Sequence, residues 1–188
     1  GKTEAFLLPI LNDLFLNPRH NNETGVRSII LYPMNALVRD QNERLYKWLK
    51  GQNIITMFFY NSETPENSRD TQRSKDENFT DKCFIPYREN ARNNPPDIMI
   101  TNYSMLEYML SRPQDYPLIG NALRSIIVDE VHLYNGSLAA EISLLLKRVL
   151  IKANKKSDNI LYIATSATLN ENEKESKDFF SSFFDKEP

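Results

Sequence analysis

The sequence predicts an α/β protein in which a parallel β-sheet is covered by helices on both faces. Short apolar runs alternate along the chain with segments of helical periodicity, as in consecutive βαβ units. These runs lack the alternation of polar and apolar residues seen in half-exposed strands, so they are typical of strands buried on both faces. A length of 188 residues, with 40% hydrophobic and 26% charged residues, fits one compact domain, residues 1–188.

Five strands and five helices are expected in alternation. The strands are expected at residues 26–32, 54–60, 97–101, 125–129 and 160–164. The helices are expected at residues 5–16, 36–50, 104–110 and about 138–150, with a charged last helix beginning near Glu171. Residues 61–95 show little periodicity, and we expect there a long surface excursion that contains one short helix.

Composition excludes several classes of protein. The net charge of −2 gives no overall basic signal, so a nucleic-acid partner would have to be held locally. A single cysteine, Cys83, cannot form an internal disulfide, and two histidines do not supply a cysteine/histidine zinc cluster. No run of about 18 apolar residues could span a bilayer, and the first residues lack a secretory signal pattern. We therefore expect a cytoplasmic protein without a membrane partner.

Polar clusters directly follow four of the expected strands. They occupy residues 33–35, 101–102, 129–130 and 165–166. Because ligands of parallel sheets bind at the carboxyl ends of the strands, the four clusters predict one site along one edge of the sheet.

The sharpest of these signals is the acidic pair Asp129-Glu130, followed by Val131-His132. Successive side chains diverge at a strand end, so one carboxylate can reach a hydrated Mg²⁺ while the other polarises a water molecule. Phosphoryl transfer requires this division of labour, because its catalysis consists mainly of positioning and charge neutralisation. The alternative is a solvated pair of carboxylates, with His132 as a polar residue on the approach to the next helix.

The first three residues, Gly1-Lys2-Thr3, match the end of the phosphate-binding pattern G-x-x-x-x-G-K-[ST]. In that pattern backbone N–H groups surround the phosphates, the lysine reaches the β/γ oxygens and the threonine binds Mg²⁺. A helix follows at once and supplies the positive end of its dipole. The strand and most of the loop that belong to the pattern are not in this sequence, so we expect an N-terminally truncated phosphate site.

Two further groups of polar residues each leave a choice open. The hydroxyls of residues 165–168 could hydrogen-bond toward Asp129 from a neighbouring strand end, or could serve only in turn formation and helix capping. The turns at residues 33–41 and 101–104 could hold nucleic-acid phosphates through exposed amides at a helix start. Their structural alternative is N-capping, by Asn35 in the first turn and by Asn102 or Ser104 in the second.

Taken in order, these segments resemble the first RecA-like lobe of superfamily 2 helicases of the DEAD/DEAH type, over nearly the whole chain. GKTEAF resembles the end of motif I, YPMNALVRDQ motif Ia, ITNYSMLEYML motif Ib, VDEVH motif II and TSATL motif III. YPMNAL, TNYSMLEYML and DEVHLYNG are most similar to the large bacterial helicases of the Lhr and MrfA branch, many of which are linked to DNA repair or defence.

The resemblance implies a RecA-like, P-loop NTPase fold that uses ATP and Mg²⁺, and it implies a role for each matching residue. Gly1, Lys2 and Thr3 would bind the ATP phosphates, Thr3 and Asp129 would hold Mg²⁺, and Glu130 would activate the attacking water. The residues that would link nucleotide state to strand movement are His132, Ser166 and Thr168. Those that would lie along the nucleic-acid backbone are Asn35, Arg39, Gln41, Thr101 and Asn102.

The implied function is the ATP-binding motor lobe of an ATP-dependent helicase or translocase, with DNA favoured over RNA as its track. The second RecA-like lobe, which completes the ATP site in relatives, does not follow in this sequence, so we expect the isolated fragment to be inactive. Residues 61–65 depart from the family, which often has a glycine-containing turn there. The alternatives are a non-catalytic RecA-like module that binds nucleic acid or a partner protein, and a P-loop ATPase unrelated to nucleic acids.

Overall fold

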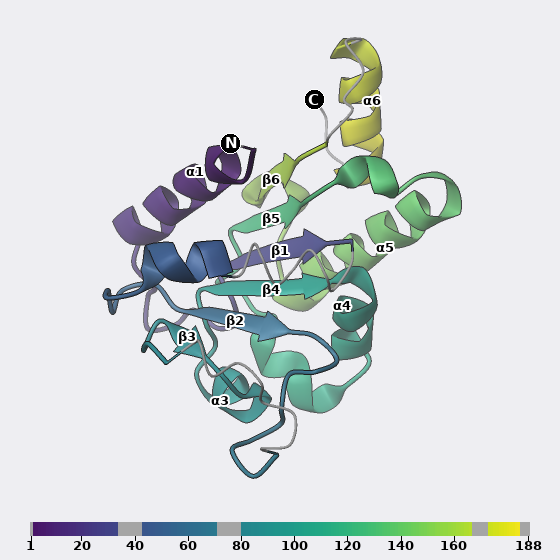
Figure 1. Ribbon diagram of the computed structural model, residues 1–188. Helices are drawn as coiled ribbons and strands as arrows, with labels where there is room; N and C mark the ends of the chain where they lie inside the picture. The colour runs from purple at the N-terminus through teal and green to yellow at the C-terminus, as the bar shows by residue number, and fades with distance from the viewer. Residues whose placement is uncertain (1, 34–42, 71–79, 167–172, 185–188) are drawn as a thin grey trace.

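The computed structural model describes residues 2–33, 43–70, 80–166 and 173–184, apart from the side chains of Lys2, Thr3 and part of the last helix (Figure 1). The strands are β1 (Ser28–Tyr32), β2 (Met57–Tyr60), β3 (Phe84–Ile85), β4 (Ile98–Asn102), β5 (Ser125–Val128) and β6 (Leu161–Ala164). The α-helices are α1 (Lys2–Leu16), α3 (Arg88–Asn93), α4 (Tyr103–Leu110), α5 (Gly136–Ala153) and α6 (Glu173–Phe184), and residues 43–49 are also helical. Three short 3₁₀ turns complete the described elements: η1 (Pro113–Leu118), η2 (Val131–Leu133) and η3 (Ser157–Asn159).

The six strands form one sheet in the order β3-β2-β4-β1-β5-β6, and every neighbouring pair is parallel. All residues of β1, β2 and β5 are buried, as the uninterrupted apolar runs predict for strands covered on both faces. The five expected strands are therefore present, with boundaries that differ by a few residues. The predicted α/β fold is confirmed.

Each face of the sheet has its own core, because the side chains of a strand alternate between the two faces. Ile30 and Tyr32 of β1 pack in the core beneath α1 and residues 43–49. Ile29 and Leu31 pack in the core beneath α4, η1 and α5. The sheet is thus the middle one of three layers (Figure 1).

Residues 61–95 are more closely integrated than the expected surface excursion. The segment supplies the edge strand β3, which pairs with β2, and the short helix α3. Cys83 and Ala91 are fully buried. A strand of two residues is too short to show a hydrophobic period, and for this reason the sequence did not indicate β3.

The burial of Cys83 predicts a slow thiol. Burial, followed by a hydrogen bond with Asp81 and then its charge, raises the pKa of the Cys83 thiol to about 12, so almost no thiolate is present at pH 8. In the native protein we expect Cys83 to react with a thiol reagent such as DTNB far more slowly than in denaturant. Equal rates of this cysteine with and without denaturant would contradict the burial.

No helix within the described ranges has the length and the apolar character that crossing a membrane requires.

Candidate functional site

The polar residues expected to share one edge of the sheet follow strands that lie side by side. In the sheet order, β4, β1, β5 and β6 are consecutive, with Leu31 beside both Thr101 and Val128, and Val128 beside Ala164. Their carboxyl ends therefore meet at one edge. Helix α1 runs opposite to the strands, so its amino end is directed toward the side of their carboxyl ends (Figure 1).

The Asp129 carboxylate is held in a fixed orientation just after β5. Its Oδ1 accepts hydrogen bonds from the backbone N–H of Glu130, at 3.0 Å, and from the hydroxyl of Thr165. Backbone bonds join the same segments: Asp129 N donates to Leu31 O at 2.9 Å, and Val131 N donates to Thr165 O at 2.8 Å. Oδ2 takes part in neither side-chain bond. Of the two alternatives left open for the hydroxyl segment, the contact with Asp129 is the one that Thr165 makes.

Glu130 adopts a backbone conformation that is uncommon for residues other than glycine. Its φ of 49° and ψ of 46° lie in the left-handed region, which costs roughly 1 kcal/mol or more for a residue with a Cβ. The backbone N–H of Glu130, directed at Asp129 Oδ1 and 3.2 Å from Thr165 Oγ1, helps to hold this conformation. Such strain collects at functional sites, where it fixes the direction of a side chain.

The side chain of Glu130 is in part unsatisfied. Its Oε2 atom is buried and accepts no hydrogen bond of good geometry from the described residues. The same oxygen lies 3.2 Å from His132 Nδ1. A buried carboxylate oxygen without a donor is costly, so this atom suits a site that receives a water molecule or a cation.

His132 and Ser166 are brought together as expected. The Oγ atom of Ser166 is 3.2 Å from His132 Nδ1, so β6 and the segment after β5 are linked on the side of the acidic pair. Glu130, His132 and Ser166 therefore form a continuous polar chain between two neighbouring strand ends. Thr168 lies outside the described residues.

The two nucleic-acid candidates after β4 have structural partners. Asn102 caps α4, because its side-chain oxygen accepts from Met105 N at 2.9 Å. The hydroxyl of Thr101 is buried and donates to Tyr60 O at 2.7 Å, so a direct contact of this side chain with a ligand would require it to leave that bond. The capping alternative is thus realised for Asn102. The turn still presents the amino end of α4 at the shared edge.

The structure does not describe the side chains of the other predicted site residues. Gly1, Asn35, Arg39 and Gln41 lie outside the described residues, as do the side chains of Lys2 and Thr3. The backbone of Lys2 and Thr3 belongs to the first turn of α1. A phosphate would meet the positive end of the helix dipole there.

Two tyrosines near the acidic pair were not among the sequence candidates. Tyr32 ends β1, and Tyr134 follows η2. Both are buried, and burial together with the negative charge of Asp129 raises the pKa of each phenol. Nothing in the sequence distinguishes either tyrosine from a residue that packs in the core. Only the effect of the Asp129 charge on each phenol shows that both lie near the acidic pair.

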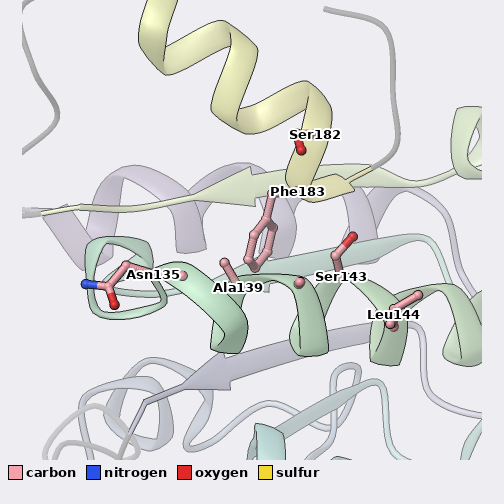
Figure 2. A pocket seen from close by; sticks show the side chains of 8 residues that line it. Asn135, Ala139, Ser143, Leu144, Ser182 and Phe183 are labelled. Carbon is pink, nitrogen blue, oxygen red and sulfur yellow. The ribbon is translucent and has the colours of Figure 1, made fainter.

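A groove of about 620 Å³ lies elsewhere, between the start of α5 and the end of α6. Figure 2 shows Phe183 of α6 directed toward α5, between Ala139 and Ser143. None of the described residues that line this groove carries a charge. It offers shape and apolar surface, and it does not contain the acidic pair.

The fold and the site together define a RecA-like lobe, with a parallel sheet that carries an acidic pair at the carboxyl end of one strand. The chain belongs to the DEAD/DEAH box helicase family, whose model matches residues 1–176.

The chain is similar to several curated helicase proteins. It is 26% identical to Druantia protein DruE of Escherichia coli, over 90% of this chain and 14% of that protein. It is also 26% identical to the uncharacterized ATP-dependent helicase MJ1574 of Methanocaldococcus jannaschii, over 100% of this chain and 24% of that protein. The chain thus spans less than a quarter of the length of these relatives.

Solved structures share the fold. The DUF1998 helicase MrfA superposes with a TM-score of 0.70 at 23% identity, over 99% of this chain and 25% of that one. MrfA has also been solved bound to DNA and AMPPNP. The DEAD-box helicase Mss116, bound to single-stranded RNA and UDP-BeF, gives a TM-score of 0.64 at 19% identity, over 95% of this chain and 32% of that one.

Proposed function

We propose that this chain is the ATP-binding motor lobe of an ATP-dependent helicase or translocase that acts on DNA. The observation that carries the proposal is the Asp129-Glu130 pair, with one carboxylate fixed by Thr165 and the other held by a left-handed backbone at the carboxyl end of β5. This arrangement presents two carboxylates with different environments to one ligand. A hydrolase needs such a difference, because one group binds while the other takes a proton.

The residues proposed for this edge are compatible with Mg²⁺, which does not need a cluster of protein ligands. Such a cluster, of three His, Cys, Asp or Glu side chains, does not occur within residues 2–33, 43–70, 80–166 and 173–184. Mg²⁺ in phosphoryl-transfer sites is bound by one or two carboxylates together with phosphate oxygens and water, so Asp129 with the hydroxyl of Thr3 would be a suitable set. When bound, the ion would neutralise the charge of the phosphate oxygens.

In this proposal the chain's own residues divide the work. Asp129 is held in its orientation, since Thr165 and the Glu130 N–H both donate to it. Glu130 accepts the proton of the attacking water at its unsatisfied Oε2, and Lys2 contacts the phosphates. His132 and Ser166, which are already in contact, link Glu130, as it takes up this proton, to the end of β6. Thr168 follows beyond that strand end.

The nucleic acid is proposed to lie across the turns that follow β1 and β4, at Asn35, Arg39, Gln41, Thr101 and Asn102. The structure of MrfA bound to DNA supports DNA, and the Mss116 structure with RNA is the reason to test both. A role in DNA repair or defence, a second RecA-like lobe as partner and a cytoplasmic location complete the proposal. MrfA and DruE are much longer than this chain, which is consistent with a further lobe in the full-length protein.

The test is ATP turnover by the full-length protein with and without nucleic acid. We expect single-stranded DNA to stimulate hydrolysis more strongly than RNA of the same sequence. Because phosphate contacts dominate such binding, the DNA concentration for half-maximal stimulation should rise about tenfold or more between 50 and 200 mM salt. Equal turnover with and without either nucleic acid would reject the proposal.

A further inference from the structure

Tyr134 has a buried hydroxyl group without a hydrogen-bond partner among the described residues. The residue is 2% exposed, and its hydroxyl oxygen makes no hydrogen bond to any residue that the structure describes. Buried polar groups in native proteins are almost always paired, since an unpaired one loses its bonds to water without replacement. An exception in the segment that directly follows the acidic pair therefore requires a reason.

The position of Tyr134 supplies one. Glu130 and Tyr134 flank the 3₁₀ turn η2 as its N-cap and C-cap, and the backbone N–H of Tyr134 donates to Val131 O at 3.0 Å. Each of the two flanking residues carries a buried side-chain oxygen that lacks a hydrogen-bond partner among the described residues. One of these oxygens is an acceptor, and the other belongs to a phenol that can donate or accept. Both follow Asp129 within one short segment.

The ring of Tyr134 contacts the turn after β4. It packs edge-on against Tyr103, with the ring centroids 6.4 Å apart and the planes at 82°. Tyr103 is the first residue of α4 and follows the cap residue Asn102 directly. The Tyr103–Tyr134 contact thus connects the acidic segment to the turn at which we propose that nucleic acid binds.

We propose that Tyr134 is a positioning residue that couples nucleotide binding at Asp129-Glu130 to the Asn102 turn. Its hydroxyl gains a hydrogen-bond partner when a nucleoside triphosphate occupies the site, and its ring passes the resulting shift to α4 through Tyr103. This inference rests on the proposed function, because it needs both a nucleotide and a nucleic acid. It assigns to Tyr134 a role that no motif of the sequence indicated.

The test uses Tyr134→Phe in the full-length protein, because this change removes the hydroxyl and keeps the ring. In the absence of ligand we expect the melting temperature to stay the same or rise, since an unpaired polar group is removed. The affinity for AMPPNP with Mg²⁺, measured by calorimetry, should fall about fivefold or more. The ratio of DNA-stimulated to unstimulated ATP turnover should fall by a similar factor.

Tyr162→Phe is the matched control. Tyr162 is also a buried tyrosine, but its hydroxyl is 3.3 Å from the donor Ser157 Oγ, and it packs against Phe184 of α6. We expect this variant to keep both the AMPPNP affinity and the stimulation ratio. A lower melting temperature would be its only effect.

The outcomes separate the two proposals. If the wild-type protein binds AMPPNP and Tyr134→Phe binds it equally well with the same stimulation ratio, the coupling role is wrong and the helicase proposal stands. If Tyr134→Phe melts several degrees lower without ligand, the hydroxyl already has a partner and the role is structural. If the wild-type protein neither binds AMPPNP nor responds to DNA, both proposals fail together.

Discussion

Replacing Glu130 with glutamine is expected to lower the rate of ATP hydrolysis by the full-length protein by about 10²–10⁴-fold, the usual contribution of a positioned general base. Glutamine keeps the size of the side chain and its ability to accept a hydrogen bond, but it cannot take up a proton. Because Asp129 and the start of α1 remain, nucleotide binding should change little. The measurement is single-turnover hydrolysis beside equilibrium binding of AMPPNP.

Glu141→Gln provides the control for this prediction. Glu141 is an exposed residue of α5, so the same chemical change is made away from the acidic pair. Its hydrolysis rate should match that of the wild-type protein. Hydrolysis by Glu130→Gln within a factor of two of wild type would show that another group activates the water.

The largest expected effect on stability comes from Asp97→Ala. Asp97 lies at the amino ends of the strands, opposite the acidic pair. Asp97 is 7% exposed, and its Oδ1 accepts from Arg27 Nε at 2.7 Å. Its Oδ2 accepts from the backbone N–H of Thr56 at 2.8 Å and from the Thr56 hydroxyl at 3.1 Å. The single carboxylate thus serves the strand starts of β1 and β4 and the residue before β2.

Removing this carboxylate would leave the guanidinium of Arg27 buried, at 2% exposure, without its counter-charge. Breaking a buried pair in this way costs about 3–5 kcal/mol of unfolding free energy. The remaining bonds of Arg27, to the carbonyl oxygens of Leu14 and Asn17, do not neutralise its charge. Urea unfolding followed by the fluorescence of Trp48 gives the free energy.

Asp158→Ala is the matched control, because Asp158 is exposed in η3. A surface substitution of this kind should change the free energy of unfolding by no more than about 0.5 kcal/mol. A loss below about 1 kcal/mol for Asp97→Ala would mean that water enters and replaces the network, against the expected cost of a buried unpaired charge.

The sheet and the common edge could be predicted because they depend on local patterns. Apolar runs marked the central strands, and the polar residues that follow them marked the carboxyl ends. Placing two strand ends side by side offered the contact of the 165–168 segment with Asp129 as one of two alternatives, and Thr165 makes it. The edge strand β3 was not predicted, because two residues are too few to show a hydrophobic periodicity.

Other features depend on partners that are distant in sequence. Arg27 looked like an ordinary residue in an apolar run, because Asp97, its counter-charge, lies 70 positions away. The left-handed backbone of Glu130 has no signal in a sequence that offers no glycine there. The hydroxyl of Tyr134 became significant only when the fold showed it buried and unpaired among the described residues.

The ion network around Asp97 lies at the amino ends of β1 and β4, and the acidic pair at Glu130 lies at the carboxyl end of the neighbouring β5. The buried ion network that stabilises the fold is thereby separate in space from the residues that we propose to hydrolyse ATP. Inactivating changes at the catalytic end should consequently yield proteins that remain intact and still associate with their ligands. Glu130→Gln would then serve as a trap, holding the nucleic acid it recognises long enough for that strand to be recovered and sequenced.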